Sequence, residues 1–239
     1  MILSRSFRDA TPGEGIPQKA WGISSMAEFT KYPVRAAILL LLFLLSSACV
    51  TVSQPRLKIE HYTLEYAPPG PLDGPALPMV LRIDLFTVAP SYNARQMVYR
   101  DRSFKREIDP YHHWRAHPGD LVSDFLARDM RHSGLFKAVV QERSAIAATH
   151  ILEGSLDEFF EWNDEGGRKA VLAVSATLIA AREVDATRRV LFQKTFRALE
   201  PTREKTPGGL AEAMSEAMSR VSMEIVRTVH EHLSLSIEY

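Results

Sequence analysis

The stretch that decides the fold begins as HILEGSLDEFFEW at residues 150–162 and continues, after NDEGGR at 163–168, as VLAVSATLIAA at 171–181. A third segment, VLFQKTFRA at 190–198, follows the polar residues DATRR at 185–189. Short turns between apolar segments are typical of strands that pair with their neighbours in the chain. The stretch therefore predicts three strands in an antiparallel meander.

Hydrophobic periodicity within these segments indicates which faces are buried. Apolar or small residues alternate with polar ones in the first segment: Leu152, Gly154, Leu156 and Phe160 against Glu153, Ser155 and Asp157. Such alternation is typical of a strand with one buried face. Residues 171–181 are apolar on both faces, as expected of a central strand that is covered on each side.

A long helix is predicted after the meander. Thr206 and Pro207 suit its cap and first turn. Apolar residues then recur every three or four positions: Leu210, Met214, Ala217 or Met218, Val221, Ile225, Val229 and Leu233. About 26 residues at 1.5 Å each give a helix of roughly 39 Å. Three methionines of this helix allow two interpretations: Met214, Met218 and Met223. We favour a role in core or partner-facing packing over a contact with lipid.

Upstream segments complete the predicted domain. Residues 59–66 and 80–88 are expected to be strands, separated by a Pro-rich loop at 67–78. Residues 93–114 favour a hairpin, and residues 115–134 a helix that begins near Pro118 and stops at Gly134. The sequence thus predicts an α+β single domain over 58–239, with a mainly antiparallel sheet packed by two helices.

Residues 31–49, KYPVRAAILLLLFLLSSAC, resemble a secretory signal. Lys31 and Arg35 precede an uncharged apolar run, and small residues lead into Cys49, the only cysteine. A lone thiol at that place is best explained as a lipid acceptor, and the segment is similar to a bacterial lipobox. The alternative is an uncleaved membrane anchor, because the uncharged run is close to the roughly 17 residues that a spanning helix needs.

This interpretation divides the chain into an N-terminal extension with a signal peptide at 1–48, a tether at 49–57 and the domain at 58–239. Met26 is a candidate start in place of Met1. The part from Cys49 onward has a net charge of about −2, because residues 1–48 hold five of the 29 cations and three of the 29 anions. We expect no nucleic-acid partner, since nucleic-acid binding requires a clustered basic surface.

Catalytic and metal-binding motifs were sought next. The sequence has no G-x-S-x-G, no phosphate-binding glycine loop and no H-E-x-x-H, so no catalytic residue, cofactor or metal is predicted. One cluster could suggest a metal: His112, His113 and His117 with Asp109 and Asp120. Adjacent residues of a strand point to opposite sides, so a solvated loop is favoured.

Tyr99 and Arg100 are candidate residues of a binding surface. The alternative, which we favour from the residues alone, is that Tyr99 belongs to the core and that Arg100 pairs with a neighbouring carboxylate.

The order of these segments resembles the ABC-type transport auxiliary lipoprotein family, whose named example is a paraquat-inducible lipoprotein. The likeness covers about 58–233 and rests on Val98-Tyr99-Arg100, on Trp114 before the helix and on Gly134-Leu135-Phe136 after it. It implies a non-enzymatic, lipid-anchored accessory subunit of a Mce-type transport system for lipids or other hydrophobic molecules. Tyr99, Arg100 and Trp114 would then contribute to partner binding.

The resemblance also implies a location and an assembly. Val50, rather than Asp, follows the cysteine, which resembles the default that is sorted to the outer membrane. The expected partners are a Mce-domain periplasmic protein and further copies of this chain in a ring. Two alternatives stay open: an adaptor or ring-forming lipoprotein of another envelope system, and a lipoprotein hydrolase with an unrecognised site.

Overall fold

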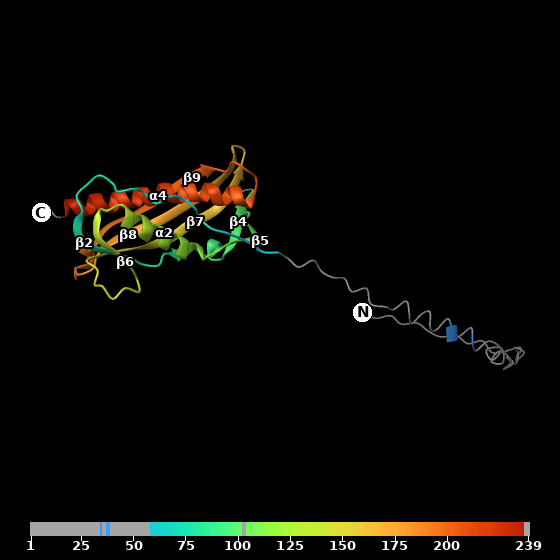
Figure 1. Ribbon diagram of the computed structural model, residues 1–239, viewed down its shortest axis with the longest axis horizontal. Helices are drawn as coiled ribbons and strands as arrows, with labels where there is room; N and C mark the ends of the chain where they lie inside the picture. The colour runs from blue at the N-terminus through green and yellow to red at the C-terminus, as the bar shows by residue number, and fades with distance from the viewer. Residues whose placement is uncertain (1–33, 35–36, 39–57, 102–103, 237–239) are drawn as a thin grey trace, which may run out of the picture. The chain divides into compact units, whose positions relative to one another are not determined.

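A computed structural model describes residues 34, 37–38, 58–101 and 104–236 of the 239-residue chain (Figure 1). The chain divides into two compact units, residues 1–55 and 56–239. The described residues of the first unit, at 34, 37 and 38, are helical and exposed. Cys49, the tether at 49–57 and most of the predicted signal peptide lie outside the described residues.

The second unit combines strands with helices in an α+β arrangement. Its elements are β1 (Glu60–Tyr62), β2 (Leu77–Ile83), β3 (Thr87–Val88), the 3₁₀ helix η2 (Pro90–Tyr92), β4 (Gln96–Arg100), β5 (Glu107–Trp114), α2 (Pro118–His132), β6 (Phe136–Gln141), β7 (His150–Asp164), β8 (Gly167–Ala180), α3 (Ala186–Arg189), β9 (Val190–Pro201) and α4 (Pro207–Leu235).

Strand β7 is the centre of the nine-stranded sheet. On one edge it pairs with β8, which pairs in turn with β9, both antiparallel. On the other edge three short strands pair with it in parallel, one after another along its length. β2 lies beside the start of β7, β3 beside its middle and β4 beside its end. The length of β7, 15 residues, allows all three to share one partner.

The predicted meander and the predicted hairpin of β4 and β5 are both confirmed. The prediction of a mainly antiparallel sheet is wrong, because the sheet is mixed: β1 pairs with β5, and β2 with β6, in parallel. Strand β6 was not predicted. Alternation of apolar residues reports which face of a strand is buried, and it carries no information about the direction of the partner strand.

The predicted strand at 80–88 is interrupted. β2 ends at Ile83. The alternation of Leu81, Ile83 and Leu85 with polar residues predicted that Leu85 is buried, but Leu85 is 54% exposed while Phe86 is 2% exposed. The Phe86 ring lies over Gly154 of β7, where a Cβ would be only 2.6 Å from the ring. The N–H of Phe86 donates to Ser123 Oγ of α2 at 2.8 Å. The break thus lets Phe86 fill the space above a glycine. At the N-terminal end, β1 is shorter than the predicted strand at 59–66.

The two predicted long helices are confirmed, and both pack on the sheet (Figure 1). Pro118 is in the first turn of α2, and Gly134 follows its end with a φ of 70°. Thr206 caps α4 by accepting a hydrogen bond from the N–H of Gly209 at 3.0 Å. A third, one-turn helix, α3, occupies the predicted turn between β8 and β9.

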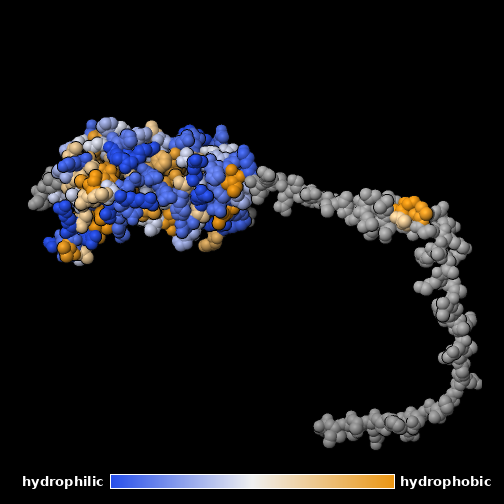
Figure 2. All heavy atoms as spheres, turned by 60° about the horizontal axis from the view of Figure 1, so that its bottom comes forward, coloured by the Kyte–Doolittle hydropathy of each residue, from blue (hydrophilic) through white to orange (hydrophobic). Residues whose placement is uncertain are grey.

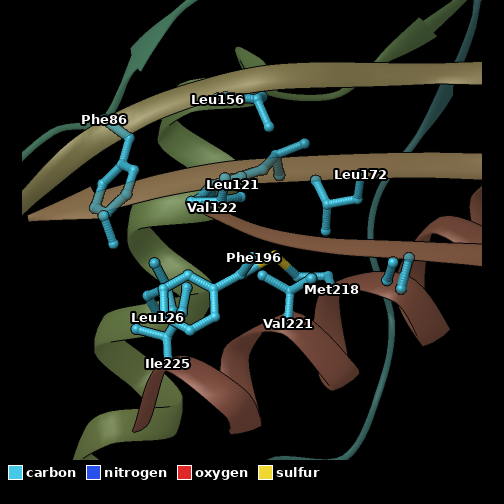
Figure 3. Close-up of a cluster of buried hydrophobic side chains, with 14 of the residues drawn as sticks. Phe86, Leu121, Val122, Leu126, Leu156, Leu172, Phe196, Met218, Val221 and Ile225 are labelled. Atoms are coloured by element: carbon cyan, nitrogen blue, oxygen red, sulfur yellow. The ribbon is translucent and has the colours of Figure 1, made fainter. Parts of the chain in front are cut away.

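The hydrophobic core lies between the sheet and these helices (Figure 3). Leu156, Leu172 and Phe196 of the sheet face Met218, Val221 and Ile225 of α4, with Leu121, Val122 and Leu126 of α2 beside them. Every apolar position that predicted α4 is buried, including Met214 and Met218. These two methionines therefore serve core packing, whereas Met223 is half-buried.

A buried carboxylate joins the two long helices. Asp129 of α2 accepts hydrogen bonds from Tyr66 Oη at 2.6 Å and from Ser222 Oγ of α4 at 2.7 Å. Arg128 pairs with its other oxygen at 2.8 Å. Burial and the neighbouring carboxylate raise the pKa of Tyr66, so the phenol stays a hydrogen-bond donor. Asp129 thus ties α2, α4 and the chain after β1 together.

Ile225→Ala should lower the free energy of unfolding by about 2–5 kcal/mol, because it leaves a cavity where α4 meets the sheet. The control is Arg227→Ala on the exposed side of the same helix, which should change stability by less than about 0.5 kcal/mol. Urea unfolding followed by circular dichroism measures both. Equal effects of the two variants would contradict the placement of α4.

Asp129→Ala should cost about 3 kcal/mol or more, since it leaves two buried hydroxyls, those of Tyr66 and Ser222, without an acceptor. Asp124→Ala removes an exposed carboxylate from the same helix and should change stability by less than about 0.5 kcal/mol. Differential scanning calorimetry compares the two. An Asp129 variant as stable as the Asp124 variant would contradict the structural role of this network.

Candidate partner-binding surface at the β4–β5 hairpin

The β4–β5 hairpin carries the residues that the sequence singled out. β4 lies between β5 and the end of β7. Tyr99 lies opposite Glu107 of β5 and Glu161 of β7, and Arg100 lies opposite Trp162. Because successive side chains of a strand point to opposite faces, Tyr99 and Arg100 serve different sides of the sheet.

Arg100 contacts an aromatic ring. Its Cζ is 4.7 Å from the centre of the Trp162 ring, and Lys169 Nζ is 6.0 Å from the same ring. The guanidinium of Arg106 lies 5.0 Å from the neighbouring Phe160 ring. Cations at such distances are attracted by the negative face of the ring. Among the described residues Arg100 forms no ion pair with a carboxylate, and its Nε is buried without a hydrogen-bond partner.

Tyr99 is half-buried and packs against the core, as one of the two readings of the sequence expected. Its hydroxyl lies 3.6 Å from Met97 Sδ. Burial, with smaller contributions from the charges of Asp109 and Glu161, raises the pKa of this phenol. Tyr99 therefore stays neutral, with its hydroxyl beside the sulfur of buried Met97.

Trp114, at the end of β5, is buried. Its ring lies 5.0 Å from the ring of Phe159, at an interplanar angle of 56°. The main-chain N–H of Trp114 donates a hydrogen bond to the carbonyl oxygen of Arg95 at 2.6 Å. Trp114 thus fixes the start of β4 and the end of β5, and any influence on a partner passes through the position of the hairpin.

The structure does not bring the histidines and aspartates of the candidate metal cluster together. His112 Nδ1 lies 2.8 Å from Asp109 Oδ2, whereas His113 packs edge-on against His61 and His117 precedes α2. Among residues 58–101 and 104–236, no group of three or more His, Cys, Asp or Glu side chains is placed to hold a metal ion. Asp109, His112 and His113 lie in β5 and not in the solvated loop that the sequence favoured.

Asp109 is nonetheless well organised. Burial by itself would raise the pKa of this carboxyl, but hydrogen bonds from His112 and from the N–H groups of Tyr111 and His112 outweigh burial and lower the pKa. Asp109 therefore stays ionised and orders the first half of β5.

Sequence reasoning missed a buried ion pair under the hairpin. Glu161 of β7 is buried, and one of its oxygens lies 3.2 Å from Arg168 Nη1 while the other has no hydrogen-bond partner among the described residues. Desolvation raises the pKa of Glu161, and the charge of Arg168 partly offsets this effect. The only sequence signal was a carboxylate between three aromatic residues, Phe159, Phe160 and Trp162.

A second feature that the sequence did not indicate is an acidic hollow beside Leu85. Two adjoining depressions, of about 640 and 390 Å³, share Leu85 and Glu142. Their other acidic residues are Asp84, Glu153, Asp120 and Asp124. These residues come together because β2 and β6, which are parallel, end beside the first turns of α2.

Figure 2 shows a mostly hydrophilic face of the domain, with hydrophobic residues in small groups. Within the described part of the chain, no helix has the length and apolar character needed to cross a bilayer. Cys49, the predicted lipid acceptor, lies outside the described residues.

Comparisons with solved structures place the fold. Protein XCC0632 of Xanthomonas campestris, described as a DUF330 protein, superposes with a TM-score of 0.68 at 16% identity, covering 75% of this chain and 99% of that one. A second structure, described as an uncharacterized protein, superposes with a TM-score of 0.56 at 12% identity, covering 72% and 99%. At these identities the likeness establishes the fold alone. No curated protein matches the chain.

A family model gives the assignment. The model described as ABC-type transport auxiliary lipoprotein component matches residues 62–226, from the end of β1 into the second half of α4. The match covers more than two thirds of the chain and includes the hairpin, α2 and the meander. This chain therefore belongs to the family of ABC-type transport auxiliary lipoprotein components.

Proposed function

We propose that this chain is an outer-membrane lipoprotein that faces the periplasm and acts as an accessory subunit of a Mce-type ABC transport system for lipids or other hydrophobic molecules. The observation that carries the proposal is the family match at 62–226, downstream of a segment that ends in small residues and a single cysteine. The expected role is binding and assembly, with no cofactor, metal or catalytic residue.

Attachment through Cys49 suits such a role. Each buried methylene contributes about 0.8 kcal/mol, so one acyl chain binds a membrane only marginally and several chains bind it persistently. A protein held at the membrane also meets its partners at a raised effective concentration. A modest interface in the folded domain is then sufficient for assembly.

The surface around Arg100 is the proposed contact for a Mce-domain partner. Arginine and tryptophan are the residue types that most often dominate interface energies. The Trp162 ring holds the Arg100 guanidinium, so less side-chain freedom is lost on binding. Tyr99, on the opposite side of the sheet, and buried Trp114 would act on the partner through the position of the hairpin. An acidic or carbonyl-rich segment of the partner would complement this surface.

A ring of copies is the proposed assembly. Interfaces that join two different surfaces of the same chain close into rings when the rotation between copies allows it. Catalysis has no part in the proposal. Among the described residues no serine hydrogen bonds a histidine, which a hydrolase with an activated serine requires.

Co-purification tests the role as a whole. The full-length chain should be expressed together with the Mce-domain protein, permease and ATPase encoded beside it, and the complex isolated through the Mce-domain protein. We expect this chain in the purified complex. Isolation of the complex without it, or its recovery with the components of another envelope system, would overturn the proposal.

Cys49→Ala should release the protein from membranes, because it removes the proposed acceptor of the lipid. Fractionation of cells and mass spectrometry of the mature N-terminus provide the measurement. The control is Cys49→Ser, which keeps a polar side chain of similar size and should also be released. Persistent sedimentation of both variants with membranes would favour an uncleaved membrane anchor.

Arg100→Glu should weaken binding of the partner at least about tenfold, equivalent to about 1.4 kcal/mol. The cation on Trp162 is lost, so a change in stability of about 1 kcal/mol is expected. Arg227→Glu makes the same charge change on exposed α4 and should bind normally. Surface plasmon resonance measures both variants. Equal affinities would remove Arg100 from the proposed interface.

A further inference from the structure

The chain enters the domain at the end where the β4–β5 hairpin turns. β1 pairs in parallel with the last residues of β5, with Glu60 opposite His112 and Tyr62 opposite Trp114. In a parallel pair both strands begin on the same side, so residues 58 and 59, which precede Glu60, lie on the side of the start of β5. The start of β5 is also where the hairpin turns. Figure 1 shows residues from 58 onward entering the domain next to β5.

The hairpin tip, which we define as Phe104, Lys105 and Arg106, presents an aromatic side chain followed by two cations. Phe104 is fully exposed, and its φ is 66°. Bulky residues rarely adopt this left-handed conformation, since it costs energy and glycine or asparagine fits it better. The fold therefore holds a large apolar residue in a strained conformation without burying it. Strain that brings no burial points to a role outside the domain.

Further apolar residues extend the hairpin tip along the open edge of β5. Ile108 and Tyr111 are exposed, and Ile59 beside them is also exposed. β1 pairs only with residues 112–114, so no described strand covers residues 107–111. Lys105 forms an ion pair with Glu107, and the Arg106 guanidinium lies against Phe160.

The length of the tether brings this surface within reach of a membrane. Ten residues lie between Cys49 and Glu60, and the eleven steps from one to the other span at most about 40 Å when fully extended. From His112, which lies opposite Glu60, β5 extends back about 17 Å to its start at Glu107. A lipid on Cys49 is therefore close enough for the hairpin tip to touch the bilayer that holds it.

The acidic hollow lies away from the hairpin along β7, and the hairpin end carries charges of both signs, since Lys105 pairs with Glu107 and Lys169 with Asp164. The acidic hollow lies beside residues 153–155 of β7, whereas β4 ends beside residues 161–162. Eight residues of strand correspond to about 26 Å. Anionic membranes attract basic segments near their surface and repel acidic ones within about a Debye length. The same field would draw the hairpin tip inward and keep the acidic hollow away.

We propose that the hairpin tip is a second membrane contact, in which Phe104 inserts among the headgroups of an anionic bilayer while Lys105 and Arg106 face lipid phosphates. This inference rests on the proposed lipid at Cys49. The covalent lipid determines that the domain is at the membrane, and the hairpin tip determines its orientation.

Fluorescence quenching tests the orientation. Two variants of the full-length lipidated protein are compared, F104W and, as matched control, V184W. Each is bound to vesicles of phosphatidylethanolamine and phosphatidylglycerol that contain a spin-labelled lipid, which quenches tryptophan fluorescence at the bilayer. Val184 is 94% exposed and follows β8, whose end pairs with the start of β7, far from the hairpin. We expect quenching above wild type for F104W and none for V184W. Equal quenching, or none in either variant while the protein stays on the vesicles, would overturn the proposal.

A second variant separates insertion from folding and from other contacts. F104N suits the left-handed conformation, so its stability should equal or exceed that of the wild type. On the same vesicles it should increase hydrogen exchange at residues 104–108, which V184N should not do. If F104N changed the oligomeric state of the protein but left hydrogen exchange at residues 104–108 unchanged, the hairpin tip would instead contact a second copy of the chain. Loss of wild-type protein from the vesicles would overturn this inference together with the proposed lipid anchor.

Discussion

The structure depends on the pairing of one long strand, β7, with partners on both edges. On one edge β8 continues the meander, and on the other β2, β3 and β4 succeed one another. The close approach at Gly154 makes this succession possible, because the Phe86 ring occupies the space where a side chain would be. A Cβ at that position would collide with the carbonyl oxygen of Ser175 in β8 and with the Phe86 ring, so it would disturb both the β7–β8 pairing and the packing of Phe86. The position of the β4–β5 hairpin at the far end of β7 follows from the same pairing.

Along β7 the chemical character of the surface changes. Beside its middle lies an acidic hollow at the ends of two parallel strands, and beside its end lie cations over aromatic rings. The polarity of the interior also changes along β7. The core under α4 is apolar, whereas the end of β7 holds the ion pair of Glu161 and Arg168. An auxiliary subunit has to orient itself toward other components, and a domain with two chemically different ends can do so. In our proposals the β4–β5 hairpin is the element that orients the domain.

Much of the fold could be predicted from local patterns. The period of apolar residues predicted α2, α4, the meander and the hairpin, and the caps at Pro118 and Thr206 lie where expected. The direction of β2, β4 and β6 could not be predicted, because their partners are distant in the chain. The register of Leu85 and Phe86 was predicted wrongly for a related reason: the break in the strand follows from contacts with Gly154 and Ser123 on other elements.

The candidate site divides in the same way. The sequence by itself determined the family resemblance, the segment that ends in Cys49, and the choice of Tyr99, Arg100 and Trp114 as candidate binding residues, since these depend on residue type and order. Only the tertiary structure decided that Trp114 is buried, that Arg100 rests on Trp162, and that Phe104 is exposed beyond the start of β5. Strand pairing over long distances in the chain sets these relations, and pairing energies depend on which residues meet in space rather than on which follow one another.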